Sequence, residues 1–328
     1  MIIDSYISYV KNIKRYSSRT VQIYKEVIMK YATLVFGTDD VSDSQLLESL
    51  NPSEIRSYEV RLMDEEKMVP KTVRLHLSAL SGFCRYLVKE GHLQSNPVRL
   101  VPKPKVEKRL PHYFRKEAMD DYFARTAFHA SEETLDMFLQ TSELKTGKDL
   151  YEKRLSRLII YLLYSTGLRR SELMSLKVED IDFGRKVAKV HGKGNKMREI
   201  PLIVSLCEEI LLYLRAVETL TGEERSLKSP LMVTYAGKPL YPAYVDRTVK
   251  RELGDVKGIT GRKSPHVLRH SLATELMNEE ADLNSIKEML GHASLATTQV
   301  YTHSSFARLK NIYKTAHPRA KNGGKHGD

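Results

Sequence analysis

A proline-rich segment at residues 96–105 constrains the fold of this 328-residue chain more than any other feature. It reads Asn-Pro-Val-Arg-Leu-Val-Pro-Lys-Pro-Lys. Proline fixes φ and lacks an N–H donor, so neither a helix interior nor a central strand can run through three prolines. An extended, semi-rigid linker is expected instead. Because the chain is also long for one domain, we expect domains over 1–100 and 112–316, joined by a basic linker over 101–111.

The residues before the linker predict four short amphipathic helices that form a compact bundle. Apolar residues recur there at helical spacing, and serine, asparagine and proline stand where helices begin. Glycines stand where two of the helices end. The predicted helices run from Ile3 to Ile13, from Ser17-Ser18 to near Gly37, from Pro52 onwards, and from Pro70 to Gly91.

The domain after the linker is predicted to be mainly helical, with one β-hairpin. Residues 186–191 and 197–202 have the pattern of two short strands, and the Gly-Lys-Gly-Asn-Lys stretch at 192–196 has that of the turn between them. Residues 127–152 are polar and only loosely periodic, so no element is assigned to them. The fold class is therefore mainly α with a small β-sheet.

The charge balance is compatible with a polyanionic partner. Lys and Arg total 53 against 41 for Asp and Glu, which gives a net charge of +12. Neutralising phosphates releases counterions, so such a surplus favours nucleic-acid binding. A basic surface without such a partner would give the same total, and residues 302–328 alone hold six Lys or Arg and one Asp, hence +5. Residues 317–328 read as a disordered basic tail.

Other classes of protein find little support in the sequence. No stretch approaches the roughly 18 apolar residues that span a bilayer, and no basic segment followed by an apolar run indicates a secretory signal. Cys84 and Cys207 lie far apart, without metal-ligand spacing. We therefore expect a cytosolic protein that needs no metal, no cofactor and no membrane.

Two short stretches of the second domain place candidate functional residues near glycines. Arg169 and Glu172 follow the helix break at Thr166-Gly167 and share a helical face; a structural salt bridge is the alternative interpretation. Lys193 lies between two glycines in the hairpin turn, where the backbone can approach a ligand closely. A solvated turn lysine is the alternative there.

Two further stretches lie towards the end of the chain. Ser264-Pro265 predicts a helix start, which places His266 and Arg269 three residues apart near a helix N-terminus that favours anions. Tyr301 stands nine residues after His292, but a single tyrosine would usually be a packing aromatic. We assign four apolar residues of this region to the core: Met277, Ile286, Met289 and Leu290.

The order of these motifs resembles the tyrosine recombinase or phage integrase family, especially its compact bacterial Xer-like members. The motifs are Thr-Gly-Leu-Arg-x-Ser-Glu-Leu, Gly-Lys-Gly-Asn-Lys, His-x-Leu-Arg-His-Ser, Leu-Gly-His and Val-Tyr-Thr-His. The resemblance covers most of residues 155–303, and each motif alone would be weak. Residues 1–100 also resemble the SAM-like core-binding domain of that family in pattern. The segment at 127–152 is longer than in the compact members.

The resemblance implies that Tyr301 is the nucleophile and that Lys193 is the general acid on the leaving 5′ oxygen. A phenol with a pKa near 10 needs a cationic pocket or a base to attack phosphorus, and an ammonium group can protonate an alkoxide. A covalent 3′-phosphotyrosyl link conserves the bond energy, so rejoining needs no ATP. The chemistry of these residue types therefore agrees with the implied roles.

The resemblance also implies which residues surround the scissile phosphate. These would be Arg169, Arg269 and His292, with His266 as a phosphate ligand or proton acceptor and Glu172 in support. Planar guanidinium groups match the non-bridging phosphate oxygens, and donors fixed in advance are often the largest catalytic contribution.

The expected function is site-specific recombination of double-stranded DNA through a Holliday junction, in the bacterial cytoplasm and on the nucleoid. By analogy with the family, four protomers would act on two inverted-repeat sites, as one species or with a second recombinase, each closing around DNA. A helix over 304–316 would dock on a neighbouring protomer or pack on its own domain. The alternatives are type IB topoisomerase-like relaxation and a non-catalytic DNA-binding regulator. Candidate DNA-binding residues are Lys71, Arg74, Arg85, Lys103, Lys105 and Lys196; solvated helix faces and a plain spacer are the alternative interpretation.

Overall fold

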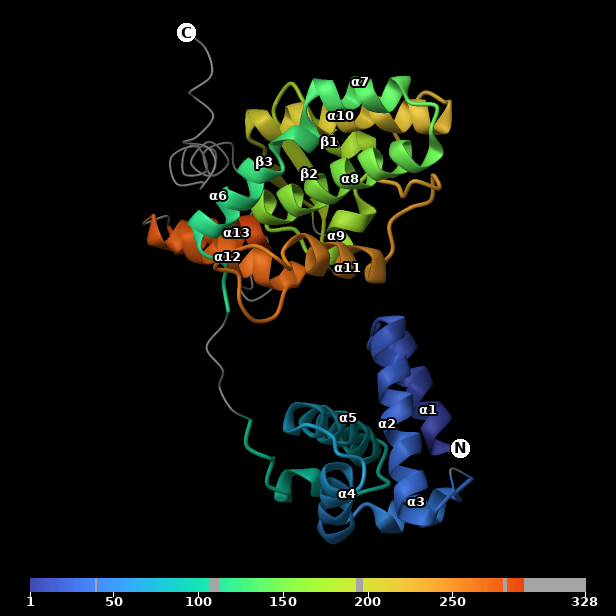
Figure 1. Ribbon diagram of the computed structural model, residues 1–328. Helices are drawn as coiled ribbons and strands as arrows, with labels where there is room; N and C mark the ends of the chain where they lie inside the picture. The colour runs from blue at the N-terminus through green and yellow to red at the C-terminus, as the bar shows by residue number, and fades with distance from the viewer. Residues whose placement is uncertain (39, 107–111, 193–196, 280–281, 292–328) are drawn as a thin grey trace. The chain divides into compact units, whose positions relative to one another are not determined.

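The computed structural model describes residues 1–328 except 39, 107–111, 193–196, 280–281 and 292–328. The chain divides into two compact units, unit 1 over Met1–Arg109 and unit 2 over Leu110–Asp328. Both are mainly helical, and the described strands form one small sheet in unit 2 (Figure 1). The predicted fold class is therefore confirmed. Within the described ranges no helix has the length and apolar character needed to cross a membrane.

Unit 1 contains one helix more than the sequence predicts. The additional helix is α3, a helix of seven residues whose N-terminus is closed by a capping box between Ser42 and Gln45. Leu46 of this helix is buried in the core of the unit. The elements are α1 (Ile2–Ser8), the π-helical turn η1 (Tyr9–Ile13), α2 (Ser18–Phe36), α3 (Asp43–Ser49), α4 (Pro52–Asp64) and α5 (Pro70–Lys89).

The predicted ends of the longer helices are confirmed by their caps. The Ser17 side chain accepts a hydrogen bond from the backbone N–H of Thr20, and α2 ends at Gly37 in the left-handed region, with φ of 77°. The Asn51 side chain caps α4 in the same way. These bonds satisfy backbone groups that a helix end leaves unpaired.

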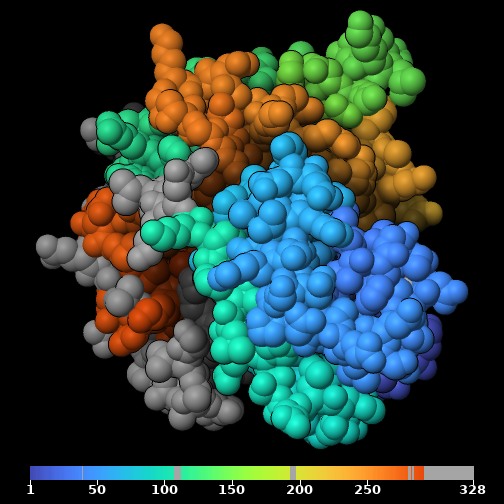
Figure 2. Space-filling model, turned by 90° about the horizontal axis from the view of Figure 1, so that it is seen from below, coloured from blue at the N-terminus to red at the C-terminus, as the bar shows by residue number. Residues whose placement is uncertain are grey.

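Aromatic side chains hold the core of unit 1 together. Tyr31 and Tyr58 meet edge to face, with ring centroids 5.0 Å apart. Their hydroxyl groups have buried partners, since Tyr31 donates to the Ser49 carbonyl over 2.8 Å and Tyr58 lies 2.7 Å from Nδ1 of His76. In the space-filling view the helices of this unit, coloured blue to turquoise, form a continuous packed surface (Figure 2).

The proline-rich segment is not extended from its start, which corrects the prediction for its first half. Residues Pro97–Leu100 form a 3-10 helix, η2. Proline is tolerated at the first helical position because its missing N–H would be unpaired there anyway. Val98 and Val101 are buried in the core of unit 1, and the Asn96 side chain donates to the Ser81 carbonyl over 3.1 Å.

Unit 2 is built around the long helix α8, whose last twelve residues are all buried. Helices α7, α10, α11 and α12 pack against α8. The elements in order are α6 (Lys116–Arg125), η3 (Ala127–Ala130), α7 (Glu132–Gln140), α8 (Leu144–Thr166), α9 (Arg170–Ser175), η4 (Val178–Asp180), β1 (Ile181–Asp182), β2 (Val187–His191), β3 (Met197–Pro201), α10 (Val204–Thr221), α11 (Pro242–Glu252), α12 (Pro265–Asn278) and α13 (Leu283–Leu290).

The predicted hairpin is present, and a short first strand extends it to three. The order is β1-β2-β3, antiparallel throughout, with Val190 opposite Arg198 and Ala188 opposite Ile200. Val190, Ala188 and Ile200 are buried in the core of unit 2. The hairpin is therefore anchored at its base by apolar packing.

The stretch at 127–152, to which the sequence assigned no element, folds as η3, α7 and the first turns of α8. Arg154, a buried arginine of α8, holds the start of this stretch in place by donating to the Ser131 carbonyl over 2.7 Å and to Oγ1 of Thr134. Arg157 joins α8 to neighbouring segments, since it pairs with Glu209 over 2.7 Å and donates to the Phe123 carbonyl. Long-range contacts that local periodicity does not reveal therefore determine this region.

The core assignments near the end of unit 2 are confirmed with one exception. Ile286, Met289 and Leu290 are buried, whereas Met277 is 45% exposed. Met277 lies in the last turn of α12, one residue after the buried Leu276. The predicted helix at 304–316, the tail at 317–328 and the turn residues Lys193 and Lys196 lie outside the described residues.

Candidate active site

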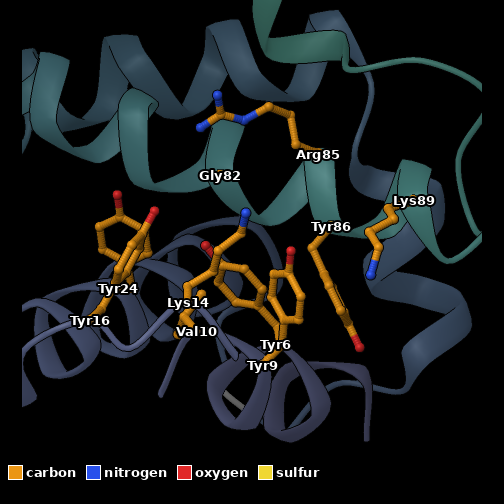
Figure 3. A pocket seen from close by; sticks show the side chains of 10 residues that line it. All are labelled: Tyr6, Tyr9, Val10, Lys14, Tyr16, Tyr24, Gly82, Arg85, Tyr86 and Lys89. Atoms are coloured by element: carbon orange, nitrogen blue, oxygen red, sulfur yellow. The ribbon is translucent and has the colours of Figure 1, made fainter. Parts of the chain in front are cut away.

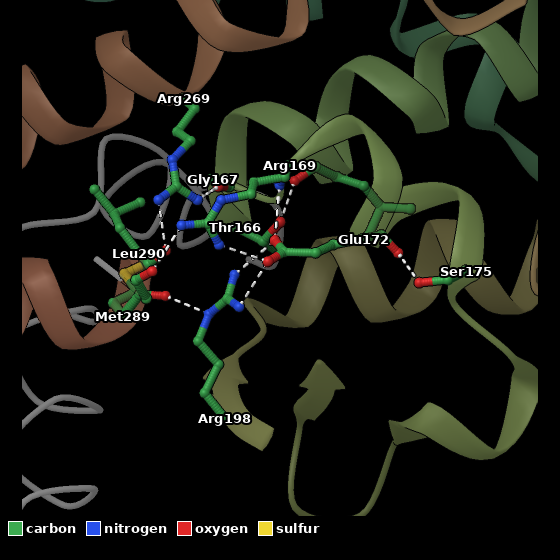
Figure 4. A network of polar contacts seen from close by, with 11 residues as sticks. Thr166, Gly167, Arg169, Glu172, Ser175, Arg198, Arg269, Met289 and Leu290 are labelled. Atoms are coloured by element: carbon green, nitrogen blue, oxygen red, sulfur yellow. Dashed lines mark hydrogen bonds and ion pairs between the residues drawn. The ribbon is translucent and has the colours of Figure 1, made fainter. Parts of the chain in front are cut away.

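Three of the predicted site residues meet where α8, α9, α12 and α13 approach one another. Arg169, Glu172 and Arg269 belong to one network of polar contacts there (Figure 4). The predicted residues Lys193, His292 and Tyr301 lie outside the described part of the chain. The described geometry therefore concerns the arginine pocket and the start of the segment that leads to Tyr301.

Gly167 ends α8 and determines how the chain turns into the pocket. Its φ is +63°, in the left-handed region. A Cβ atom at this position would lie 2.5 Å from Cδ2 of Leu290 and 3.2 Å from Cδ2 of Leu272, so Leu290 would have to move to admit a side chain. The Gly167 carbonyl accepts a hydrogen bond from Nη1 of Arg269 over 2.7 Å. The carbonyl group at the predicted helix break is thus also a hydrogen-bond acceptor for Arg269.

Glu172 holds Arg169 at the start of α9. Oε2 of Glu172 accepts from the backbone N–H of Arg169 over 2.8 Å, and Oε1 accepts from Nη1 of Arg169 over 2.7 Å. The local salt bridge that the sequence offered as an alternative is therefore formed. Glu172 is buried, whereas the Arg169 side chain is 34% exposed, so the guanidinium group is fixed on one side and open on the other.

Arg198 of β3 also binds Glu172, and the sequence analysis did not single it out. Its Nη1 and Nη2 donate to the two carboxylate oxygens over 3.0 and 2.8 Å, and its Nε donates to the Met289 carbonyl over 2.8 Å. A signal was available, since Arg198 stands two residues before Ile200 and so shares the inward face of the strand. A charge on a buried face requires a buried partner.

Arg269 lies in α12, which begins as predicted at Ser264-Pro265, although the Ser264 side chain makes no capping bond. The Arg269 side chain is buried and donates to the carbonyls of Gly167 and Leu290. His266, one turn earlier on the same helix, is exposed. The N-terminal half of α12 thus carries a buried, hydrogen-bonded Arg269 and an exposed His266.

Three successive carbonyls at the end of α13 each accept a hydrogen bond from a different arginine. Helix C-termini leave such carbonyls without a helical partner and carry a partial negative charge, so guanidinium groups are suitable partners. The bonds run from Arg198 to Met289, from Arg269 to Leu290, and from Arg169 to Gly291, the last over 2.6 Å. In the sequence His292 follows directly.

The pocket carries a net positive charge. Burial opposes ionisation of Glu172, yet hydrogen bonds from Arg198 and from the Arg169 backbone lower the pKa of this carboxyl group to about 2. Burial, with the neighbouring Arg169 charge, lowers the pKa of Arg269 to about 10. Glu172 is therefore ionised and Arg269 protonated at neutral pH, and the formal charges of three arginines and one glutamate sum to +2.

The predicted DNA-binding residues are accessible where the structure describes them. Lys71, Arg74 and Arg85 are exposed on α5, and Lys103 and Lys105 are exposed after η2. Arg85 also borders a hollow in unit 1 that is lined by residues of α1, η1, α2 and α5 (Figure 3). The hollow is lined by tyrosines and cations, namely Tyr6, Tyr9, Tyr16, Tyr24, Tyr86, Lys14, Arg85 and Lys89, together with Val10 and Gly82.

The arginines gathered around Glu172, beside a short hairpin, place several guanidinium groups in one pocket, and guanidinium donors suit phosphate oxygens. Among the described residues, no group of three or more His, Cys, Asp or Glu could hold a metal ion. Residues 132–308 match the phage integrase family, and residues 3–91 match the N-terminal SAM-like domain of phage integrases. The chain belongs to the phage integrase family, and it is a tyrosine recombinase, an enzyme that cleaves and rejoins DNA.

The similarity to individual relatives extends over nearly the whole chain. The tyrosine recombinase XerC of Chlorobaculum parvum is 33% identical over 325 residues, covering 97% of this chain and 94% of the relative. That of Azotobacter vinelandii is 33% identical over 321 residues, covering 97% and 96%. Among solved structures, XerH recombinase bound to a palindromic difH substrate has a TM-score of 0.62 at 19% identity, over 95% of this chain and 83% of that one. A lambda integrase dimer bound to a COC′ core site has a TM-score of 0.59 at 19% identity, over 92% and 97%. These two likenesses show the fold.

Proposed function

We propose that this tyrosine recombinase cleaves DNA through Tyr301 and that Arg169 and Arg269 hold the scissile phosphate. The observation that carries the proposal is the joint anchoring of the end of α13 by both arginines. That end leads directly into the sequence of His292 and, nine residues later, Tyr301. The two arginines therefore bind the main chain directly before the sequence that contains the proposed nucleophile.

The pocket suits a phosphate that gains charge during transfer. Each guanidinium has five N–H donors, and Arg169 and Arg269 each use two of them on described partners. We propose that donors not used on these described partners bind the non-bridging oxygens, and that the positive charge of the pocket stabilises the transition state. His292 would complete the phosphate contacts. The exposed His266 would bind the phosphate or accept the tyrosine proton.

The proposed reaction balances without a cofactor. Tyr301 Oη attacks phosphorus and loses its proton, the bond from phosphorus to the 5′ oxygen breaks, and a 3′-phosphotyrosyl bond forms. Lys193 gives a proton to the leaving 5′ oxygen. The 5′ hydroxyl of a partner strand then reverses the step, which makes a Holliday junction and releases Tyr301. The energy of the phosphodiester bond is kept throughout, so no nucleotide triphosphate is consumed.

The proposed partner is double-stranded DNA that carries an inverted-repeat recombination site. The solved XerH structure is described as bound to a palindromic difH substrate and the lambda integrase structure as a dimer bound to a COC′ core site, and this supports DNA as the partner here. We propose that residues 1–100 bind DNA through the exposed cations of α5, that the basic residues of 101–111 join this domain to the catalytic one over 112–316, and that the two close around the duplex. Four protomers would act on two sites, as one species or with a second recombinase, in the bacterial cytoplasm and on the nucleoid.

The proposal is tested with a nicked DNA substrate that traps the covalent intermediate. The wild-type chain is expected to form a protein–DNA adduct, Tyr301→Phe to form none, and Tyr313→Phe, a matched change twelve residues further on, to behave as wild type. Equal adduct in wild type and Tyr301→Phe would refute the nucleophile assignment. Absence of adduct in all three would indicate a DNA-binding regulator instead.

A second assay separates recombination from DNA relaxation. A supercoiled plasmid with two copies of the footprinted site is expected to give products with exchanged flanking sequences. Relaxed plasmid without exchange would indicate a type IB topoisomerase-like activity. The footprint itself gives the repeat symmetry and spacing on which the proposed assembly depends.

A further inference from the structure

We propose that Arg198 is a positioning residue, which fixes the β2–β3 hairpin against the arginine pocket so that Lys193 can protonate the leaving 5′ oxygen. The inference rests on the proposed function, because it assumes that Lys193 is the general acid. It adds a role for a residue whose described hydrogen bonds go to Glu172 and to the Met289 carbonyl.

The position of Arg198 on its strand is the first support. Side chains alternate between the two faces of a strand, and in β3 Met197 is 59% exposed while Arg198 and Ile200 are buried. Arg198 is therefore the inward-facing residue of β3 that is nearest in sequence to residues 193–196. The pairing of β2 and β3 includes the opposite residue, Val190, whose side chain is also buried.

The contacts of Arg198 join three elements in one side chain. Its two Nη atoms bind both oxygens of Glu172 in α9, and its Nε binds the Met289 carbonyl at the end of α13. The hairpin is thus tied both to the residue that holds Arg169 and to the helix end that precedes His292 (Figure 4). A planar fork with several donors is required, and a lysine ammonium cannot reproduce this set.

Gly291 gives independent support for the close fit of Arg198. Its φ is +65°, and a Cβ atom there would lie 3.2 to 3.4 Å from Nη1, Cζ and Cδ of Arg198. The guanidinium group is therefore packed against the backbone at this turn as well as hydrogen-bonded to it. An apolar residue would fill a buried site without the desolvation cost of a charge, so the arginine is consistent with a requirement for defined geometry.

The structure also indicates which part of the reaction depends on Arg198. Without it, Arg169 would still have its three described bonds, two to Glu172 and one to the Gly291 carbonyl. The described hydrogen bonds of Arg269 go to two carbonyls, not to Arg198 or Glu172. The hairpin would lose its described hydrogen bonds to α9 and α13 and keep the 3.8 Å contact of His191 with Asp180 of η4. Loss of Arg198 is therefore expected to impair proton delivery more than phosphate binding.

The experiment compares Arg198→Met and Arg198→Lys with Arg185→Met in the full-length protein. Arg185 is a matched control because it binds Glu199 of β3 through both Nη atoms, over 2.9 and 2.7 Å, in an exposed pair. Cleavage rates are measured on two nicked substrates, one with the normal 5′ oxygen and one with sulfur at that bridging position. A thiolate leaves without a proton, so the sulfur substrate bypasses the general acid.

On the oxygen substrate Arg198→Met is expected to be about 100-fold slower than wild type, within the range for loss of a general acid, and Arg185→Met within about 2-fold. On the sulfur substrate Arg198→Met should recover to within a few-fold of wild type, as Lys193→Ala should. Adding Arg198→Met to Lys193→Ala should cause little further loss, since both changes act on one step.

The inference is overturned if Arg198→Met is equally slow on both substrates, or if it cleaves the oxygen substrate like the Arg185 control. Thermal unfolding shows whether Arg198→Met folds. If it does not, Arg198→Lys, which keeps the charge, takes its place. Failure of the sulfur substrate to restore cleavage by Arg198→Lys would then overturn the inference. The proposed function fails in a different way, namely when the wild-type protein forms no adduct with either substrate.

Discussion

Replacing Gly167 by alanine tests whether the turn after α8 is as crowded as its contacts indicate. Gly167 and Gly222 both end helices of unit 2 in the left-handed region, with φ of +63° and +67°. A Cβ atom at Gly222 would meet nothing within 4 Å, whereas at Gly167 it would lie 2.5 Å from Cδ2 of Leu290. Gly222→Ala therefore measures the backbone strain alone, and Gly167→Ala measures strain and overlap together.

The expected magnitudes follow from these two contributions. Left-handed backbone costs an L-residue about 1–2 kcal/mol, and overpacking a core costs about 1–3 kcal/mol more. Gly222→Ala should thus lose about 1–2 kcal/mol and Gly167→Ala about 2–5 kcal/mol. For a domain of this size 1 kcal/mol corresponds to roughly 2–4 °C in Tm, so the difference is visible in thermal unfolding.

The same pair of variants has a functional consequence. Leu290 would have to move to admit the new methyl group, and its carbonyl accepts a hydrogen bond from Arg269. Gly167→Ala should therefore slow adduct formation on nicked DNA at temperatures where it remains folded, and Gly222→Ala should not. Equal Tm values and equal cleavage rates for the two variants would refute the argument that Gly167 is required by close packing.

Three further predictions concern charge. The pKa of Glu172 is held at about 2, below its ordinary value of 4.5, so the stability it contributes is present above about pH 4.5 and is lost as the pH falls towards 2. The difference in unfolding free energy between wild type and Glu172→Gln, measured by urea titration, should disappear over that window. A constant difference would contradict this prediction. Arg157→Met removes one partner of a buried ion pair and should cost about 3–5 kcal/mol, against less than about 1 kcal/mol for the exposed Arg215→Met; similar thermal unfolding of the two variants would argue against a structural role for Arg157. Arg74→Ala should lower the slope of log binding constant against log salt by about 1, in a filter-binding titration, if Arg74 contacts a DNA phosphate; an unchanged slope would exclude that contact.

Local signals in the sequence were sufficient for several helix boundaries. Ser17 and Gly37 bound α2, and Gly167 ends α8, because caps depend on the chemistry of one or two residues. The capping box before α3 was equally local but was overlooked, since a seven-residue helix has too few apolar positions to show a period. The order of short motifs was sufficient for the family.

Other features could not be obtained from local patterns because they depend on residues far apart in the chain. The start of the region at 127–152 is held by Arg154 of α8, which donates to the Ser131 carbonyl 23 residues earlier in the chain. Pro97 begins a 3-10 helix because Val98 and Val101 can enter the core of unit 1. Neither arrangement has a periodic signature that could separate it from a loop.

The candidate site shows the same division. Arg169, Glu172 and Arg269 were found from motif spacing, and the structure brings them together. Arg198 was missed because its neighbours in sequence suggested only a strand. A charged residue on the buried face of that strand was the available indication, and recognising it required knowing which face was buried.

The anchoring of α13 by three arginines has a consequence for how this enzyme could be rebuilt. All three acceptors are main-chain carbonyls, so the attachment does not depend on which side chains α13 carries, apart from the glycine that its last turn needs at position 291. Chimeric recombinases joined between α12 and α13 should therefore tolerate divergence in the transplanted helix wherever it keeps the buried apolar residues at positions 286, 289 and 290. The same three arginines would then hold the end of a transplanted α13 through its main chain.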